Sequence, residues 1–239
     1  AIPRSNIFRG NLRPDGKTFH VGIGVHRQTL DHAAYGLYSS GALCLDVSSE
    51  LSTQLNSGLF SLLVPSLNVL TSAETVPVKL AIRPQKPPTV SLGAGKWHTG
   101  KDGNPVIDEP LVKIAAKDFS ADVYALIEER WIRLFTITGD LEVPALVTAD
   151  SQGRLQPMLG DLSKALTNIK VANSELLSED PSKLATLFPT ILNVAAGMFS
   201  TNFDPIALPD FAGIELALDK GSITSVDNND LLAIFSKLE

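Results

Sequence analysis

The chain has 239 residues and a mass of 25.5 kDa, which is enough for one large domain or two small ones. Hydrophobic residues make up 44% and charged residues 19%, which excludes a disordered protein because the apolar content can offset chain entropy. The net charge of −6 gives no broad attraction to nucleic acid or anionic lipid surfaces, so nucleic acid is not an expected partner. The single cysteine, Cys44, excludes an intrachain disulfide framework and a cysteine-based zinc site.

Apolar and polar residues alternate along most of the chain. Phe19, Val21, Ile23 and Val25 alternate with small or polar residues, which is typical of a strand with one buried face. Pro77 indicates the start or the edge of a strand. Further strands are predicted at 42–47, 76–82, 89–92, 214–218 and 231–238.

The clearest predicted hairpin pairs residues 111–126 with residues 131–143. The polar run Glu128-Glu129-Arg130 supplies its turn. On the return strand Phe135, Ile137, Leu141 and Val143 share one face, and a second tight turn at 151–153 is flanked by residues 145–149 and by residues from Leu155 onward. This pattern predicts an antiparallel meander of long strands.

Three segments have helical spacing instead. Residues 28–39 and 52–63 each carry an apolar stripe. The third and longest is residues 181–203, where Asp180-Pro181 is a helix start and Pro189 predicts a kink. Since no repeat or interdomain linker is visible, we expect one α+β domain over residues 1–239.

The sequence holds no constellation of residues typical of an enzyme. There is no Gly-x-Ser-x-Gly motif, and Cys44 lies within a predicted strand, where a small buried hydrophobe is expected. Gly93-Ala94-Gly95-Lys96 lacks the other residues of a phosphate-binding loop. We therefore predict no catalytic residue, no metal site and no cofactor.

The order of these elements resembles the bactericidal/permeability-increasing protein family, within the tubular lipid-binding (TULIP) group. The likeness is to the C-terminal barrel half of that family and covers residues 18–239. Its members include the lipopolysaccharide-binding, phospholipid-transfer and cholesteryl-ester-transfer proteins. The segments that carry the resemblance are the helix 33–38 leading into the strand 42–47, the short helix 58–60 ending at Pro65, the stretch 78–90 through Pro87-Pro88, the hairpin 111–143, the helix end 199–203 and the segment 205–209.

The resemblance implies a long, highly curved antiparallel sheet, a half-barrel, wrapped around a long amphipathic helix. Family members join two such barrels through a central sheet, so the resemblance also implies a second TULIP half or a homodimer as partner. It further implies an extracytoplasmic place of action, whether secreted, periplasmic or at the cell surface.

The predicted function is non-enzymatic binding, or transfer, of lipid or another apolar ligand in a tunnel between the sheet and the helix 181–203. The alternative is a structural or protein-interaction module with the same fold, in which large side chains such as Phe60, Phe119 and Phe135 fill the core. The expected apolar lining comprises Leu30, Ala33, Leu37, Tyr38, Leu184, Leu187, Phe188, Ile191, Leu192, Ala195 and Phe199.

Overall fold

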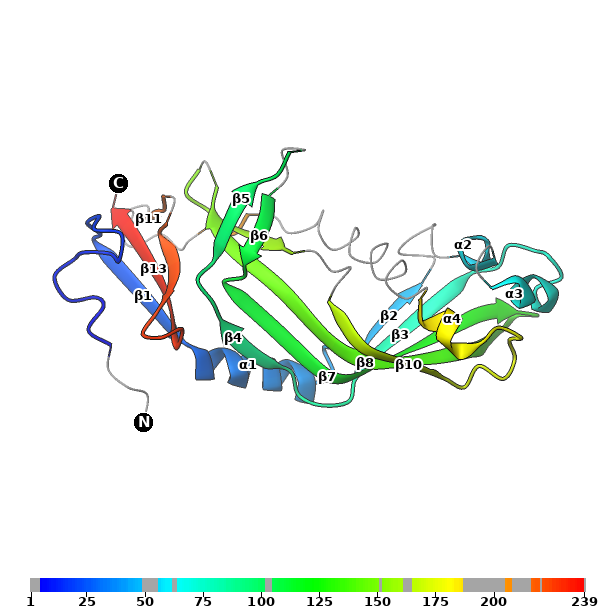
Figure 1. Ribbon diagram of the computed structural model, residues 1–239. Helices are drawn as coiled ribbons and strands as arrows, with labels where there is room; N and C mark the ends of the chain where they lie inside the picture. The colour runs from blue at the N-terminus through cyan, green and yellow to red at the C-terminus, as the bar shows by residue number, and fades with distance from the viewer. Residues whose placement is uncertain are drawn as a thin grey trace.

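The computed structural model is dominated by antiparallel sheets, the longest of which curls into a half-barrel (Figure 1). Four helices accompany the strands in the described part of the chain, and the longest of them has 13 residues. This is the α+β architecture expected from the alternating sequence. The structure describes residues 5–48, 56–61, 64–101, 105–150, 152–160, 165–186, 205–207, 216–219 and 221–238.

The long sheet is built around one hairpin, β7 (Val112–Ile127) and β8 (Arg130–Ala149). Glu128 and Glu129 form its turn with φ values of 46° and 65°, which gives the local twist that a two-residue hairpin turn requires. The predicted hairpin is confirmed, although its return strand continues to Ala149. The other strands of this sheet are β2 (Leu45–Ser48), β3 (Val78–Pro84), β4 (Thr89–Leu92), β9 (Leu155–Leu159) and β10 (Leu166–Ala172).

Irregular pairing along the hairpin accompanies the curvature of the long sheet. The register between β7 and β8 shifts between Ala116 and Phe119 and again between Val123 and Tyr124. Such bulges bend a strand and increase its right-handed twist. The pairing between β10 and β8 shifts as well, next to Asn168, whose φ is 54°.

A smaller sheet stands at one end of the molecule (Figure 1). Its middle strand is β13 (Leu231–Leu238), with β1 (Val21–His26) on one side and β12 (Ile223–Val226) and β11 (Leu216–Ala217) on the other. Phe19 and Phe235 pack here with ring centroids 4.9 Å apart. The first and last strands of the described chain, β1 and β13, therefore pair in this sheet.

A glycine in β1 allows the N-terminal segment to lie against the small sheet. A Cβ at Gly22 would come within 2.3 Å of the Phe8 ring, so only glycine leaves room for it. The Phe8 ring in turn lies 5.7 Å from that of Phe235, measured between centroids.

The helix α1 (Arg27–Ser39) lies beside β4 at the edge of the long sheet (Figure 1). The Asp31 carboxylate accepts a hydrogen bond from the Val90 backbone N–H at 2.7 Å. The helix ends before Gly41, whose φ of 76° suits a helix C-terminus. It confirms the predicted helix 28–39 to within one residue at its start.

The short helices α2 (Ser57–Ser61), α3 (Pro65–Leu70) and α4 (Pro181–Ala185) gather at the far end of the long sheet (Figure 1). α2 lies within the predicted helix 52–63, and α4 is the first part of the predicted helix 181–203. The rest of that long helix, from residue 187 to 203, lies outside the described residues. No helix of the described chain is long and apolar enough to span a membrane.

Two local predictions around α1 are wrong. The strand predicted at 42–47 begins only at Leu45, because the Ala42 N–H donates to the Leu37 carbonyl and residues 41–43 form the turn after α1. Cys44 was expected to be buried within that strand, but it precedes the strand and is exposed. The hydrogen bonds that end α1 hold residues 41–43 in a turn, so β2 begins three residues later than predicted.

The prediction for Pro65 is also wrong. Pro65 begins α3 instead of ending the preceding helix, which agrees with the preference of proline for the first helical position. The sequence also did not predict β10 or the separate hairpin of β5 (Lys96–Thr99) and β6 (Pro105–Glu109).

Candidate functional site

One face of the long sheet is apolar except at the tip of the β7–β8 hairpin, where Arg130 pairs with Ile127. Directly paired residues of neighbouring strands share a face, and the register gives rows such as Leu80–Val123–Phe135 and Val90–Ile114–Val143. We call this the apolar face. Its residues are Leu45, Val47, Val78, Leu80, Ile82, Pro84, Val90, Leu92, Val112, Ile114, Ala116, Phe119, Ala121, Val123, Ala125, Phe135, Ile137, Gly139, Leu141, Val143, Ala145, Val147, Ala149, Leu155, Pro157, Leu159, Leu166 and Val171.

The opposite face of the same strands is largely polar. The Thr136 hydroxyl donates to the Asp122 carboxylate at 2.6 Å, and Lys113 pairs with Glu142 at 3.2 Å. The long sheet thus has one apolar face and one polar face. The apolar face is removed from water only where other apolar groups pack against it.

Half of the apolar face is filled by the protein itself. Side chains of α2, α3 and α4, including Phe60, Leu67 and Leu184, form one hydrophobic core with it. The residues of this filled half are Phe119, Ala121, Val123, Phe135 and Ile137 with their partners on β3, and none of the five is more than 3% exposed.

The other half of the face is only partly buried. We call Val112, Ile114, Ala116, Leu141, Val143, Ala145 and Val147 the open half. None of these seven residues is fully buried, and Ile114 keeps 38% of its surface exposed. An aliphatic surface of this kind, continuous with a packed core, is a site where an apolar ligand gains from desolvation.

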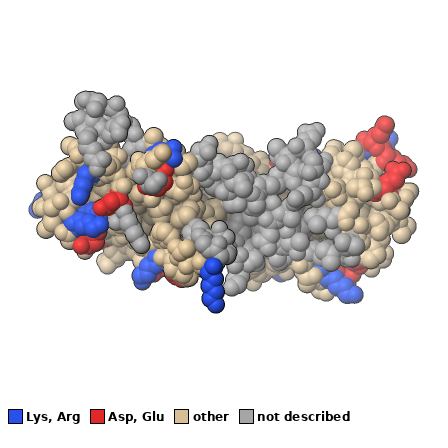
Figure 2. Space-filling view, turned by 90° about the horizontal axis from the view of Figure 1, so that it is seen from above, with Lys and Arg blue, Asp and Glu red and all other residues tan. Residues whose placement is uncertain are grey.

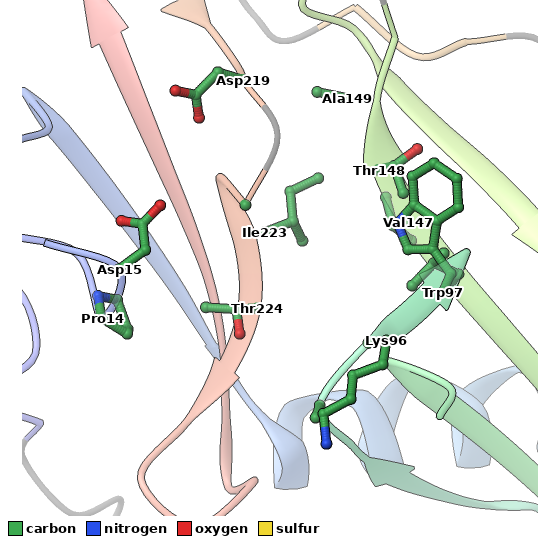
Figure 3. A pocket seen from close by; sticks show the side chains of 14 residues that line it. Pro14, Asp15, Lys96, Trp97, Val147, Thr148, Ala149, Asp219, Ile223 and Thr224 are labelled. Carbon is green, nitrogen blue, oxygen red and sulfur yellow. The ribbon is translucent and has the colours of Figure 1, made fainter. Parts of the chain in front are cut away.

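A pocket of about 560 Å³ lies where the open half approaches the small sheet, and we call it the intersheet pocket (Figure 3). Ile223 and Thr224 of β12 lie on one side of it, and Trp97, Val147 and Thr148 lie on the other. This volume falls within the range of about 300–1,000 Å³ that is usual for small-molecule pockets. Since Val147 also belongs to the open half, the pocket and the open half adjoin each other.

One hydrogen bond and one glycine help to fix the geometry of this pocket. The Ser225 hydroxyl donates to the Gly93 carbonyl at 2.6 Å, which ties β12 to the connection between β4 and β5. Gly95 has a φ of 67°, and a Cβ there would lie 3.2 Å from Leu111. The glycine therefore permits the tight turn that carries Trp97 to the pocket.

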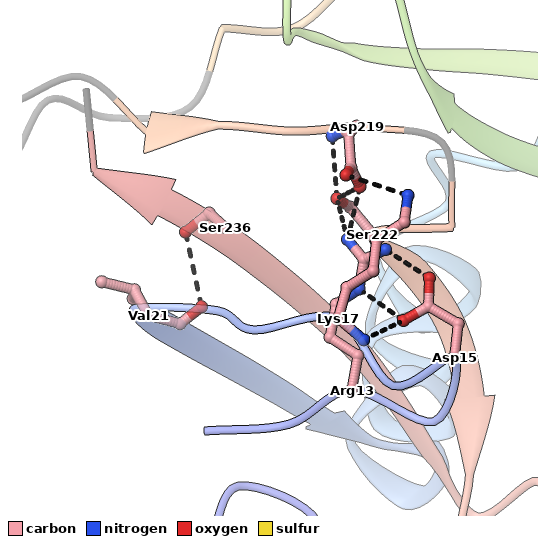
Figure 4. A network of polar contacts seen from close by, with 7 residues as sticks. All are labelled: Arg13, Asp15, Lys17, Val21, Asp219, Ser222 and Ser236. Atoms are coloured by element: carbon pink, nitrogen blue, oxygen red, sulfur yellow. Dashed lines mark hydrogen bonds and ion pairs between the residues drawn. The ribbon is translucent and has the colours of Figure 1, made fainter.

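A buried arginine, Arg13, fixes the part of the intersheet pocket wall that carries Asp15 and Asp219 (Figure 4). The Arg13 side chain is 2% exposed, donates from Nε to Asp15 at 2.9 Å and from Nη1 to the Ser222 hydroxyl at 3.1 Å, and forms an ion pair with Asp219. Asp15 and Asp219 both line the pocket. The network thus joins the loop after Leu12 to the turn before β12.

The same network perturbs the ionisation of its members. The hydrogen bond from Arg13 lowers the pKa of Asp15 to about 2. Burial acts to raise the pKa of Asp219, but hydrogen bonds from Arg13 and Ser222 outweigh it and lower that pKa below its ordinary value. Hydrogen bonding to Asp15 raises the pKa of Arg13 despite its burial. All three groups are therefore charged at neutral pH.

In Figure 2, which looks onto the concave side, described Lys, Arg, Asp and Glu side chains are visible at both ends of the molecule, and one basic side chain projects near the middle of one edge. Acidic side chains cluster at the end that carries α3 and the β7–β8 turn.

The structure places the residues predicted to line the ligand site in different environments. Leu184 is fully buried in the filled half. On α1, Leu30 and Tyr38 are half-buried, and the Tyr38 hydroxyl donates to the Gln85 carbonyl at 3.1 Å. Ala33 and Leu37 are exposed. α1 has no buried residue, so its role at the mouth of a ligand tunnel stays a prediction.

The remaining predicted lining residues lie outside the described residues: Leu187, Phe188, Ile191, Leu192, Ala195 and Phe199. Sequence reasoning placed the lining on helices and missed the strand residues of the open half. A signal for them was present, because Val112 and Ile114 flank Lys113, and Leu141 and Val143 flank Glu142.

Comparison with known proteins gives limited similarity. No family model matches the chain, and no curated protein matches its sequence. A solved structure described as that of lipopolysaccharide binding protein is similar, with a TM-score of 0.42 and 13% sequence identity. The match covers 92% of this chain and 40% of that one, so the chain spans about two fifths of the length of that protein. The candidate site is accordingly defined by this chain's own strands and pocket.

Proposed function

We propose that this protein binds a lipid or another apolar ligand without chemical turnover, on the open half and in the adjoining intersheet pocket. The observation that carries the proposal is the uninterrupted apolar face, half of which is packed while Ile114 in the other half is 38% exposed. Each methylene buried there would contribute about 0.8 kcal/mol, so an acyl chain could bind firmly without a charged contact. The resemblance to the TULIP group predicts the same class of ligand.

The proposal also includes the place where the protein acts and the partner that it has. The protein acts outside the cytoplasm, and a second TULIP half or a second copy of this chain completes the molecule. Mass measurement by light scattering tests the second copy, and a monomer at micromolar concentration would argue against it.

Native mass spectrometry of the purified protein, followed by organic extraction and lipid identification, tests the function directly. A lipid of defined class at fixed stoichiometry is the expected result. A ligand-free protein that also takes up no fluorescent fatty acid or phospholipid would contradict the proposal and favour the interaction module.

A matched pair of variants locates the ligand. Ile114→Gln places an amide on the open half, and we expect uptake of a fluorescent fatty acid to weaken about tenfold because the amide must lose its water on binding. Lys113→Gln changes the next residue, which lies on the polar face, and should leave uptake unchanged. Equal effects in both variants would place the ligand elsewhere.

A further inference from the structure

The polar face of the long sheet carries a cluster of aromatic and cationic side chains near the β7–β8 turn. Tyr124 of β7 pairs with Lys79 of β3 on one side and with Arg133 of β8 on the other, so the three side chains share this face. Trp131 lies on the same face, and Lys79 Nζ is 5.2 Å from the ring centroids of both Tyr124 and Trp131. We call Lys79, Arg83, Asp122, Tyr124, Trp131 and Arg133 the outer patch.

One mostly buried carboxylate holds the two arginines of the outer patch together. The Asp122 side chain is only 13% exposed. It accepts hydrogen bonds from the Thr136 hydroxyl at 2.6 Å and from Arg83 Nη1 at 3.3 Å, and Arg133 Nη1 lies 3.9 Å away. The Arg83 and Arg133 side chains nevertheless stay 51% and 45% exposed. Two guanidinium groups thus converge on one carboxylate, which can neutralise only one of them.

A β-bulge places part of the outer patch on the polar face. The register between β7 and β8 shifts by one residue next to Tyr124, which leaves Leu134 of β8 without a strand partner. Without this shift Arg133 would pair with Ala125 on the apolar face, and Trp131 would move with it, because a slip of one residue turns side chains to the other face of a sheet. Bulges that redirect side chains in this way are common beside functional sites.

The surroundings of the outer patch are positively charged, although the chain as a whole has a net charge of −6. From the row of Arg83 to the β7–β8 turn, the polar face of the described strands carries Asp46 and Lys170 besides the charged members of the patch. Four cations therefore stand against two carboxylates, and of these two only Asp46 is well exposed, at 61% of its side chain. A partner that docks here is favoured if it carries negative charge.

The composition and position of the outer patch favour a protein as that partner. Tryptophan, tyrosine and arginine are enriched at the centres of protein–protein interfaces. The patch lies on the outer side of the curved sheet, opposite the core, and Trp131 is 41% exposed there. Small ligands instead prefer concave sites. Docking on an anionic membrane takes clusters of about four to eight basic residues, and here two carboxylates offset half of the four cations.

We propose that the outer patch docks an acidic segment of a partner protein. Carboxylates of that segment pair with the exposed guanidinium groups of Arg83 and Arg133, and an apolar side chain beside them covers Trp131. The outer patch lies on the face opposite the apolar-ligand site, so this docking does not depend on lipid binding.

Selection from a phage library of random dodecapeptides tests this with the full chain. We expect the enriched peptides to carry several Asp or Glu residues. As free peptides followed by fluorescence polarisation, they should bind with a micromolar Kd that weakens severalfold between about 50 mM and about 200 mM sodium chloride. Enrichment of peptides that lack acidic residues, or no enrichment at all, would overturn the proposal.

Two variants assign the bound peptide to the outer patch. Arg133→Gln removes one guanidinium, and Trp131→Thr removes the aromatic surface but keeps a residue favoured in strands. Each should weaken binding of the selected peptide at least about tenfold. Arg130→Gln is the matched control and should bind as the wild type does, because Arg130 is exposed on the same strand but pairs with Ile127 on the opposite face. Wild-type affinity in Trp131→Thr would refute the proposal even if Arg133→Gln fails to fold.

Two further probes separate a protein partner from other anionic surfaces. Phosphatidylserine vesicles and heparin are each offered to the wild type and to Trp131→Thr at about 150 mM salt. We expect no binding that differs between the two proteins. Binding of either probe that is lost in Trp131→Thr, with no acidic peptide selected, would assign the outer patch to a membrane or a glycan and overturn the proposal.

Discussion

The two halves of the apolar face have the same alternation of apolar and polar residues, but they differ in how deeply their apolar side chains are buried. Ile137 in the filled half and Ile114 in the open half are the same residue type, on the same face of the same hairpin. Ile137 is 0% exposed beneath the cap of α2, α3 and α4, whereas Ile114 is 38% exposed. Alternation therefore specifies which side of a strand avoids water, but not whether other parts of the protein pack over that side.

The largest effect is expected in the filled half. Ile137→Ala should lower the free energy of unfolding by about 3–4 kcal/mol, because it leaves a cavity in a packed core. Urea denaturation followed by circular dichroism measures this. A loss below about 1.5 kcal/mol would mean that the core can collapse around the cavity, and the distinction between the halves would weaken.

The next effect is expected at the wall of the intersheet pocket. Arg13→Gln removes the partner of Asp15 and Asp219 and should cost about 2 kcal/mol of stability, less than a fully buried pair because both carboxylates are about two-fifths exposed. Urea denaturation at pH 7 provides the measurement. An unchanged free energy of unfolding would show that Arg13 is not needed to hold Asp15 and Asp219 at the wall of the intersheet pocket.

This network should also make stability depend on pH. The pKa of Asp15 is lowered to about 2 and that of Asp219 is lowered too, so their contribution is present above the unfolded pKa of about 4. It is lost as the pH falls towards 2. Comparing unfolding midpoints from pH 6 to pH 2 should show a smaller decline in Arg13→Gln than in the wild type, and parallel curves would contradict this.

A truncation in the open half should lower the free energy of unfolding less than a truncation in the filled half. Ile114→Ala removes methylenes from a residue that is already partly exposed, so we expect a loss of about 1–1.5 kcal/mol. The same urea experiment compares it directly with Ile137→Ala. Equal losses at the two positions would show that both halves are packed alike.

The smallest effect is expected at the cap over the filled half. Glu179 accepts a hydrogen bond from the Ser66 N–H at 2.8 Å and another from the Ser66 hydroxyl, which ties α3 to the segment before α4. Glu179→Gln should cost about 1 kcal/mol, and fatty-acid uptake at the open half should not change. Glu175→Gln, at an exposed position nearby, is the control in both measurements. Reduced uptake in Glu179→Gln alone would show that the two halves are coupled.

Much of the fold could be predicted because its strands alternate strongly. The strands β7, β4 and β13 were predicted to within one residue of their observed bounds, and β8 was predicted to within one residue at its start but runs six residues further than predicted. β10 was missed because the irregularity at Asn168 interrupts its alternation. β5 and β6 were missed because they are short and mixed in polarity, and their pairing depends on each other.

The candidate site could be predicted less well than the fold. Sequence periodicity drew attention to the helices 28–39 and 181–203, whereas the open half lies on strands. The bulge at residues 117 and 118 shifts the alternation, so that Ala116 and Phe119 share a face although they are three residues apart. Spacing on β7 therefore does not show that the two halves form one surface, whereas Phe135, Ile137, Leu141 and Val143 on β8 keep a regular alternation through both halves.

The sequence by itself determined that this chain folds into long antiparallel strands with one apolar side, because alternation is a local property of each strand. It also determined the turns at Glu128-Glu129 and Asp227–Asp230, whose polar residues accept positive φ. Only the tertiary structure decided that Ile137 in one half of the face is fully buried while Ile114 in the other half stays 38% exposed. Those properties depend on which distant segments pack together, and no local pattern specifies that.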